Sequence, residues 1–152
     1  MRGARPRTSI CAAILIACLA AGCGGSKYTK SDFITRADAI CTNALRQSRS
    51  IPGGSELPTY LGDLVPVLRA EETQLRALPR PPGTAHDRAA LERYYAALSH
   101  VVQDYQRLAA AAKRGDQDAV TGLEADLQAS PVYSLASSYG LRSCGTPGST
   151  AV

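Results

Sequence analysis

The chain has 152 residues, 45% of them hydrophobic, with five cysteines and a formal net charge of +4. This length suits one domain with one core. Three arginines lie within the first seven residues, and from residue 23 onward the chain has 14 basic and 13 acidic residues. Because the positive and negative charges of this part are nearly equal, its net charge is too small to attract nucleic acid or acidic lipid strongly.

The N-terminus has the pattern of a secretory signal. A basic start is followed by an apolar run from Ile10 to Ala21 and then by Gly22 and Cys23. As a helix this run would rise about 18 Å, short of a hydrocarbon core of about 30 Å, so a simple transmembrane anchor is the weaker interpretation. A basic segment, a short apolar segment and small residues before a cut site are typical of an exported protein.

The stretch LAAGC, residues 19–23, resembles a bacterial lipobox, in which a cysteine thiol carries a diacylglyceryl group. The resemblance implies that residues 1–22 are removed and that Cys23 becomes the lipidated N-terminus. Ala20 stands where leucine is commoner. The alternative is an ordinary signal peptide, with no lipid on Cys23. A lipidated Cys23 followed by a short tether, residues 23–30, would hold the domain close to the extracytoplasmic face of the cell membrane.

The chain has an odd number of cysteines, but the predicted leader and anchor account for three of them. Cys11 and Cys18 lie in the removed segment and Cys23 carries lipid, which leaves Cys41 and Cys144 in an oxidising compartment. We predict that these two form a disulfide, whose loop of about 100 residues would stabilise the fold by roughly 4–5 kcal/mol in the chain-entropy model. The alternative is that Cys41 or Cys144 is a reactive thiol or a metal ligand. The chain has no Cys-x-x-Cys motif, and a reactive thiol would have only two histidines as a possible base.

Helical spacing of apolar residues predicts the first two helices. The first runs from Ser31 to Arg49, with Thr29 or Ser31 as its cap, and presents a stripe that includes Cys41. The second covers about 58–78, and its leucines recur at intervals of three, four and seven residues. Pro66 lies inside it, so we expect a kink, with a division into two pieces as the alternative.

The rest of the chain predicts one long helix and one broken helix. Thr84 and Asp87 are typical of a capping box, and a heptad-like stripe follows until Lys113-Arg114-Gly115. Asp116 caps the next helix, which Pro131 breaks, and Gly140 ends its second piece with positive φ. No strand pattern occurs. We therefore predict an all-α, irregular four-helix bundle with its last helix broken at Pro131, a single domain at 31–145 and a disordered tail at 146–152.

Two motifs near the ends of this domain carry a family resemblance. ADAIC (37–41) and YGLRSCG (139–145) together resemble a family of small secreted proteins and lipoproteins of actinobacteria. The resemblance covers essentially the whole domain. It implies a helical domain with paired cysteines on the outer face of the membrane, and it brings no known activity.

The polar residues offer little sign of catalysis. Serine-hydrolase, zinc-protease, P-loop and EF-hand motifs are absent. We expect Asp38 to be solvated, with a cap or a salt bridge as the alternative, and we expect the helix carboxylates, Glu71 included, to be solvated. His100 and Asp104 share a face that points away from the core, so a solvated pair is expected, and the alternative of a metal site lacks further local ligands.

The tyrosines either pack in the core or contact a ligand. Tyr60, Tyr95 and Tyr105 fall on predicted core stripes, whereas Tyr94, Tyr133 and Tyr139 are expected at rims. The main interpretation is core packing, because the chain has no tryptophan and one phenylalanine. The alternative is that Tyr94, Tyr95 and Tyr139 line a pocket for haem or lipid between helices.

These observations favour a non-enzymatic envelope lipoprotein. We expect it to contact the membrane through its lipid anchor, to bind an envelope protein partner or serve a structural role, and to need neither cofactor nor nucleic acid. A small-ligand binder is the alternative, and an enzyme is the least favoured class.

Overall fold

The structure is a computed structural model that describes residues 27–52 and 54–146. The described chain forms five helices and contains no strand: α1 (Lys30–Arg49), α2 (Leu57–Ala77), α3 (Ala85–Arg114), α4 (Gln117–Ala129) and α5 (Val132–Tyr139). The predicted leader, Cys23 and the tail after residue 146 lie outside the described residues.

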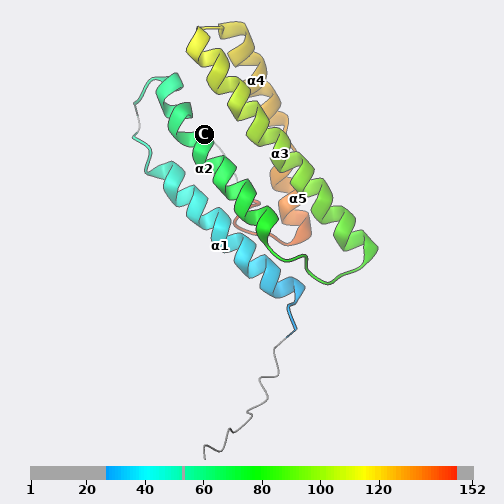
Figure 1. The fold of residues 1–152 in the computed structure, drawn as a ribbon. Coiled ribbons are helices and arrows are strands. Elements are labelled where there is room, and N and C mark those ends of the chain that lie inside the picture. Colours follow the sequence, from blue (N-terminus) through cyan, green and yellow to red (C-terminus); the bar gives the residue numbers. More distant parts are fainter. Residues whose placement is uncertain (1–26, 53, 147–152) are drawn as a thin grey trace, which may run out of the picture.

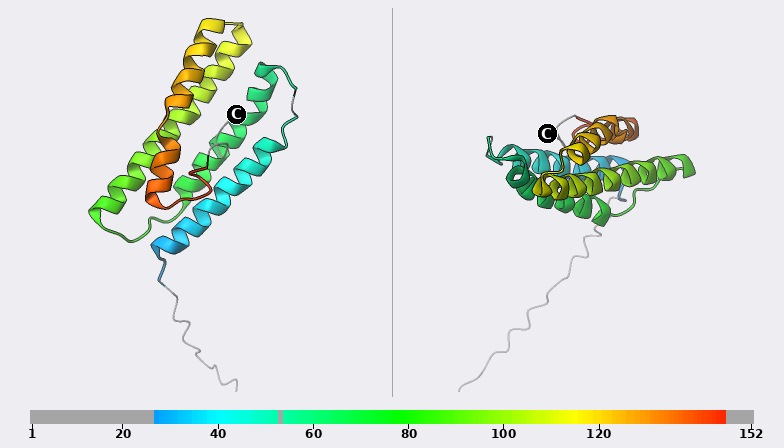
Figure 2. Two further views of the ribbon diagram at one scale, coloured as in Figure 1. Left: turned by 180° about the vertical axis from the view of Figure 1, so that it is seen from behind. Right: turned by 90° about the horizontal axis from the view of Figure 1, so that it is seen from above.

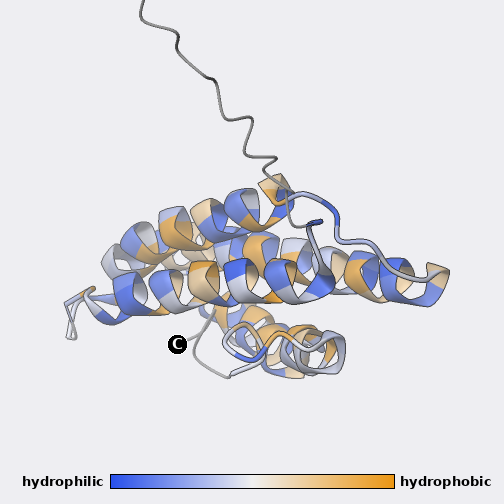
Figure 3. Ribbon diagram, turned by 90° about the horizontal axis from the view of Figure 1, so that it is seen from below, coloured by the Kyte–Doolittle hydropathy of each residue, from blue (hydrophilic) through white to orange (hydrophobic). Residues whose placement is uncertain are grey.

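α2, α3 and α4 each run antiparallel to the helix before, and α5 continues in the direction of α4 (Figure 1). α2 packs between α1 and α3, and both α4 and α5 pack on α3. Together α4 and α5 form the fourth helix of the bundle, interrupted at Ser130 and Pro131. Seen from above and from below, α4 and α5 lie to one side of the layer made by the first three helices (Figure 2, right, and Figure 3). The predicted all-α bundle with a broken last helix is confirmed.

The ends of the helices follow from local chemistry. Thr29 caps α1 and Thr84 caps α3, each in a reciprocal capping box with an aspartate three residues later. Gly115 and Gly140 end α3 and α5 with φ of 68° and 106°, which is the left-handed region that glycine tolerates best. These caps confirm the predicted ends of α1, α3 and α5 to within one residue.

α2 passes through Pro66 without a break, so the division into two pieces is wrong. Pro66 lies on the exposed side of α2, where the backbone carbonyl that loses its partner faces water. Leu64 and Leu68 on either side of it are buried and hold both halves of the helix to the same core.

One core connects all five helices. Hydrophobic and hydrophilic residues alternate along each helix, as amphipathic packing requires (Figure 3). Leucines of α2 and α3, tyrosines of α3 and α5, and the start of α1 meet in a single buried cluster that also contains both cysteines. Because residues 27–146 carry this core and the disulfide within themselves, they form one folding unit.

Candidate functional site

A disulfide joins the first helix to the end of the domain. Cys41 and Cys144 are bonded with an S–S distance of 2.03 Å and a sequence separation of 103, and both are buried. Cys41 comes from the inner face of α1, and Cys144 from the segment after α5. Gly145 allows the close approach of this segment, since a Cβ there would lie 2.2 Å from the Ser137 hydroxyl. The predicted disulfide is confirmed.

Asp38 reinforces the same junction. Its carboxylate accepts hydrogen bonds from the backbone N–H groups of Arg142, at 3.2 Å, and Ser143, at 2.8 Å. The hydroxyl of Thr42 bonds to that of Ser143 at 3.1 Å. The expectation of a plainly solvated Asp38 is therefore wrong, because the partners come from a segment far away in the sequence. A carboxylate with two backbone donors anchors a turn strongly.

The three tyrosines proposed as ligand contacts are packed in the core. Tyr94, Tyr95 and Tyr139 have exposed fractions of 1%, 1% and 5%, so the rim positions expected for Tyr94 and Tyr139 are wrong. The hydroxyl of Tyr95 donates to the carbonyl of Leu75 at 2.8 Å. The ring of Tyr139 meets Phe33 edge to face, with centroids 5.9 Å apart.

Their surroundings perturb these phenols. Burial raises the pKa of Tyr94 strongly, and the nearby Glu71, Tyr95, Asp38 and Tyr133 raise it further. Burial also raises the pKa of Tyr95 to about 12. Both phenols are therefore protonated in the folded domain at neutral pH.

Glu71 is the most unusual side chain of the core. It is 1% exposed, and neither carboxyl oxygen has a hydrogen-bond partner in the described structure. Burial raises the pKa of Glu71 to about 8, so the folded domain holds it protonated at neutral pH. The expectation of a solvated carboxylate is wrong. Glu71 occupies the core position between Leu68 and Leu75, and that gap in the leucine spacing was the signal for its burial.

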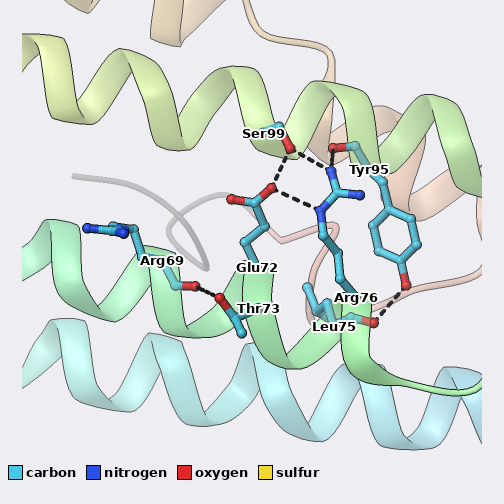
Figure 4. A network of polar contacts seen from close by, with 7 residues as sticks. All are labelled: Arg69, Glu72, Thr73, Leu75, Arg76, Tyr95 and Ser99. Atoms are coloured by element: carbon cyan, nitrogen blue, oxygen red, sulfur yellow. Dashed lines mark hydrogen bonds and ion pairs between the residues drawn. The ribbon is translucent and has the colours of Figure 1, made fainter.

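A polar clamp ties α2 to α3 next to this core (Figure 4). The guanidinium of Arg76 donates to Glu72 at 3.0 Å, to the backbone carbonyl of Tyr95 at 3.0 Å and to the hydroxyl of Ser99 at 2.6 Å. Ser99 in turn donates to Glu72. A planar guanidinium that satisfies three acceptors fixes the register of two helices in a way that an ammonium cannot.

A small cavity lies where the linker between α2 and α3 meets the end of α5. Its volume is about 100 Å³, and its lining includes Arg80, Arg88 and Tyr139. Arg80 pairs with Glu92 at 2.8 Å, and Arg88 donates to the carbonyl of Gly83 at 2.8 Å. Drug-sized ligands occupy pockets of roughly 300–1,000 Å³, so this cavity suits a small group at most.

The histidine–aspartate pair does not form as expected. Asp104 is buried and pairs with Arg107, while His100 is exposed. Within residues 27–52 and 54–146, no group of three or more His, Cys, Asp or Glu side chains could hold a metal ion. No helix in the same residues is long and apolar enough to cross a membrane.

Comparison with known proteins adds nothing to this geometry: no family model, curated protein or solved structure matches the chain.

Proposed function

We propose that this protein is a lipid-anchored component of the cell envelope, whose helical domain works on the extracytoplasmic face of the membrane as a non-enzymatic binding or structural module. Cys23 is the anchor in this proposal, and an envelope protein is the partner. The observation that supports it most is the buried Cys41–Cys144 bond, because structural disulfides persist in oxidising compartments.

The position of α1 fits an anchor at Cys23. α1 begins at Lys30, so only residues 24–29 separate it from the anchor. Six extended residues span about 20 Å. A domain on so short a tether stays next to the bilayer, which suits a function at the membrane surface.

The sites found in the domain favour a binding or structural module over a holder of haem or lipid. Tyr95 bonds to a backbone carbonyl and Tyr139 packs on Phe33, so both are engaged in the fold. The cavity beside Tyr139 is smaller than haem requires. Asp38 and Arg76 likewise hold parts of the fold to each other.

Metabolic labelling tests this proposal. The full chain is expressed in a bacterium that processes lipoproteins and is supplied with a clickable palmitate analogue. We expect label on a membrane-associated protein and loss of the label in Cys23→Ser.

The matched control is Cys18→Ser, which removes a thiol from the same N-terminal segment five residues earlier. It should keep the label and the membrane association. An unlabelled wild-type protein released into the medium would overturn the proposal and favour an ordinary signal peptide.

A further inference from the structure

One end of the bundle gathers an excess of positive charge. α1 begins there, residues 78–84 join α2 to α3 there, and α5 ends there (Figure 1). The two segments that build this end, residues 27–36 and 76–92, hold six basic and three acidic residues, and Arg76 is paired with a fourth acid, Glu72, just before the second segment. The basic residues are Lys27, Lys30, Arg36, Arg76, Arg80 and Arg88, and the acidic residues are Asp32, Asp87 and Glu92. We call this surface the basic end.

The helix farthest from the basic end has the opposite character. α4 and its cap hold four acidic residues and no basic residue: Asp116, Asp118, Glu124 and Asp126. α4 lies at the other end of the bundle (Figure 1). The basic residues at the ends of α1 and α3, Arg46, Arg49, Lys113 and Arg114, lie at the same far end, so α4 itself is acidic but the far end as a whole is not. The basic end nevertheless has a local excess of positive charge that the near balance of the whole chain does not show.

Two cations of the basic end, Lys27 and Arg88, are available to an outside partner, whereas Arg76 is held by Glu72. Asp87 pairs with Lys30 at 2.7 Å and Glu92 pairs with Arg80 at 2.8 Å. Lys27 and Arg88 are exposed and form no ion pair with any described residue.

An aromatic residue accompanies these cations at the start of the domain. The guanidinium of Arg36 lies 5.2 Å from the ring centre of Tyr28. The ammonium of Lys30 lies 4.4 Å from the ring centre of Tyr139. Tyr139 is 5% exposed and the hydroxyl of Tyr28 is buried, so these rings position the two cations from within the domain.

We propose that the basic end rests on the anionic phospholipid surface of the bilayer that carries the protein, with the acidic α4 turned away from it. This inference rests on the proposed anchor at Cys23, because the short segment 24–29 enters the domain at the basic end and keeps it within reach of the head groups. Repulsion between α4 and the same surface favours this orientation over the reverse.

The test anchors the domain chemically, so that it does not depend on lipidation in the cell. Residues 23–152 are oxidised and coupled through Cys23 to a maleimide lipid; the other cysteines of this segment, Cys41 and Cys144, are bonded to each other. The vesicles contain either phosphatidylcholine alone or an equal mixture with phosphatidylglycerol.

The readout is acetylation of lysines by mass spectrometry. The segment has only three lysines: Lys27 and Lys30 at the basic end, and Lys113 at the far end of α3. On anionic vesicles we expect Lys27 to react about fivefold more slowly relative to Lys113, the effect of roughly one basic residue at an anionic surface. About 1 M salt, with a Debye length of about 3 Å, should abolish the protection.

Two double variants with the same change in net charge locate the contact. Arg80→Gln with Arg88→Gln should reduce the protection of Lys27, whereas Arg46→Gln with Arg49→Gln at the far end of α1 should preserve it. Equal relative labelling on both kinds of vesicle, or protection that only the second pair removes, would overturn the inference. Either result would leave the anchor at Cys23 to be decided by the palmitate experiment.

Discussion

The carboxylate of Asp38 accepts a hydrogen bond at 2.8 Å from the backbone N–H of Ser143, 105 residues later in the chain. Cys41, one turn further along α1, is bonded to Cys144, the next residue after Ser143. The end of the domain is thus fixed to α1 twice within one helical turn, by a covalent bond and by a charge-assisted hydrogen bond. This double junction covers the core beside α5.

Replacing Asp38 should loosen this junction without removing the disulfide. Asp38→Ala leaves two backbone donors without an acceptor and should lower the free energy of unfolding by about 1–3 kcal/mol, with a smaller loss in Asp38→Asn. Urea unfolding measures the loss, and amide exchange should become faster at Arg142 and Ser143. Asp63→Ala, at an exposed position of α2, is the control and should change stability by less than about 0.5 kcal/mol. Equal stability of the two variants would contradict the role of Asp38.

Removing the disulfide should lower the free energy of unfolding by more than Asp38→Ala does. The double variant Cys41→Ala, Cys144→Ala opens a loop closed over a separation of 103 residues and should lower the free energy of unfolding by about 3–5 kcal/mol. Urea unfolding with and without a reductant measures it. Reductant should lower the free energy of unfolding of the wild-type protein to that of the variant, and it should leave the stability of the variant unchanged. A variant as stable as the oxidised wild type would show that the bond contributes nothing.

The stability of the domain should fall as the pH rises, because of Glu71. The pKa of Glu71 in the folded state is raised to about 8 from an ordinary value of 4.5, so the folded chain holds this proton more tightly than the unfolded chain. The stabilisation is complete below pH 4.5 and is lost as the pH rises through about 8. Urea midpoints measured across this range should decrease. Tyr94 stays protonated throughout because its pKa is raised as well.

Variants of Glu71 isolate its contribution. Glu71→Gln keeps the shape and removes the titration, so most of the decrease should disappear. Glu71→Leu completes the leucine spacing and should be more stable than the wild type at the alkaline end of the range. Glu124→Gln, on the exposed face of α4, should keep the wild-type dependence. If the stability of Glu71→Gln still decreased with pH as in the wild type, groups other than Glu71 would be responsible.

The clamp between α2 and α3 should depend on the guanidinium of Arg76 and not on its charge alone. Arg76→Lys keeps the charge but cannot reach Glu72, Tyr95 and Ser99 together, so we expect a loss of about 1–2 kcal/mol in the free energy of unfolding. Arg69→Lys, at an exposed position two turns earlier on α2, is the matched control and should have almost no effect. Equal losses in both variants would indicate that the clamp is not specific.

The fold was predictable because its signals are local. Caps such as Thr29 and Thr84 act within one turn, and the glycines after α3 and α5 end their own helices. The disulfide followed from the assignment of three other cysteines to the leader and the anchor. That reasoning succeeded for Cys41 and Cys144, while the anchor itself is still a prediction.

The misjudged residues are those whose environment comes from distant segments. Asp38 receives donors from the other end of the domain, and no local pattern contains them. Tyr94 is buried beside Tyr95, whose place in the core was predicted correctly, because α3 packs against α2 on one side and α4 and α5 on another, which makes its buried face wider than one stripe. The charge of Glu71 predicts a solvated side chain, whereas its place in the leucine spacing predicts the core, and the spacing is the signal that the structure follows.

The most direct test of the account is the intact mass of the protein extracted from membranes of a bacterium that processes lipoproteins. We expect a chain that begins at Cys23, carries diacylglyceryl on that residue, and has lost the two hydrogens of a Cys41–Cys144 bond. A chain that begins at another residue without lipid, or one with free thiols at Cys41 and Cys144, would contradict it.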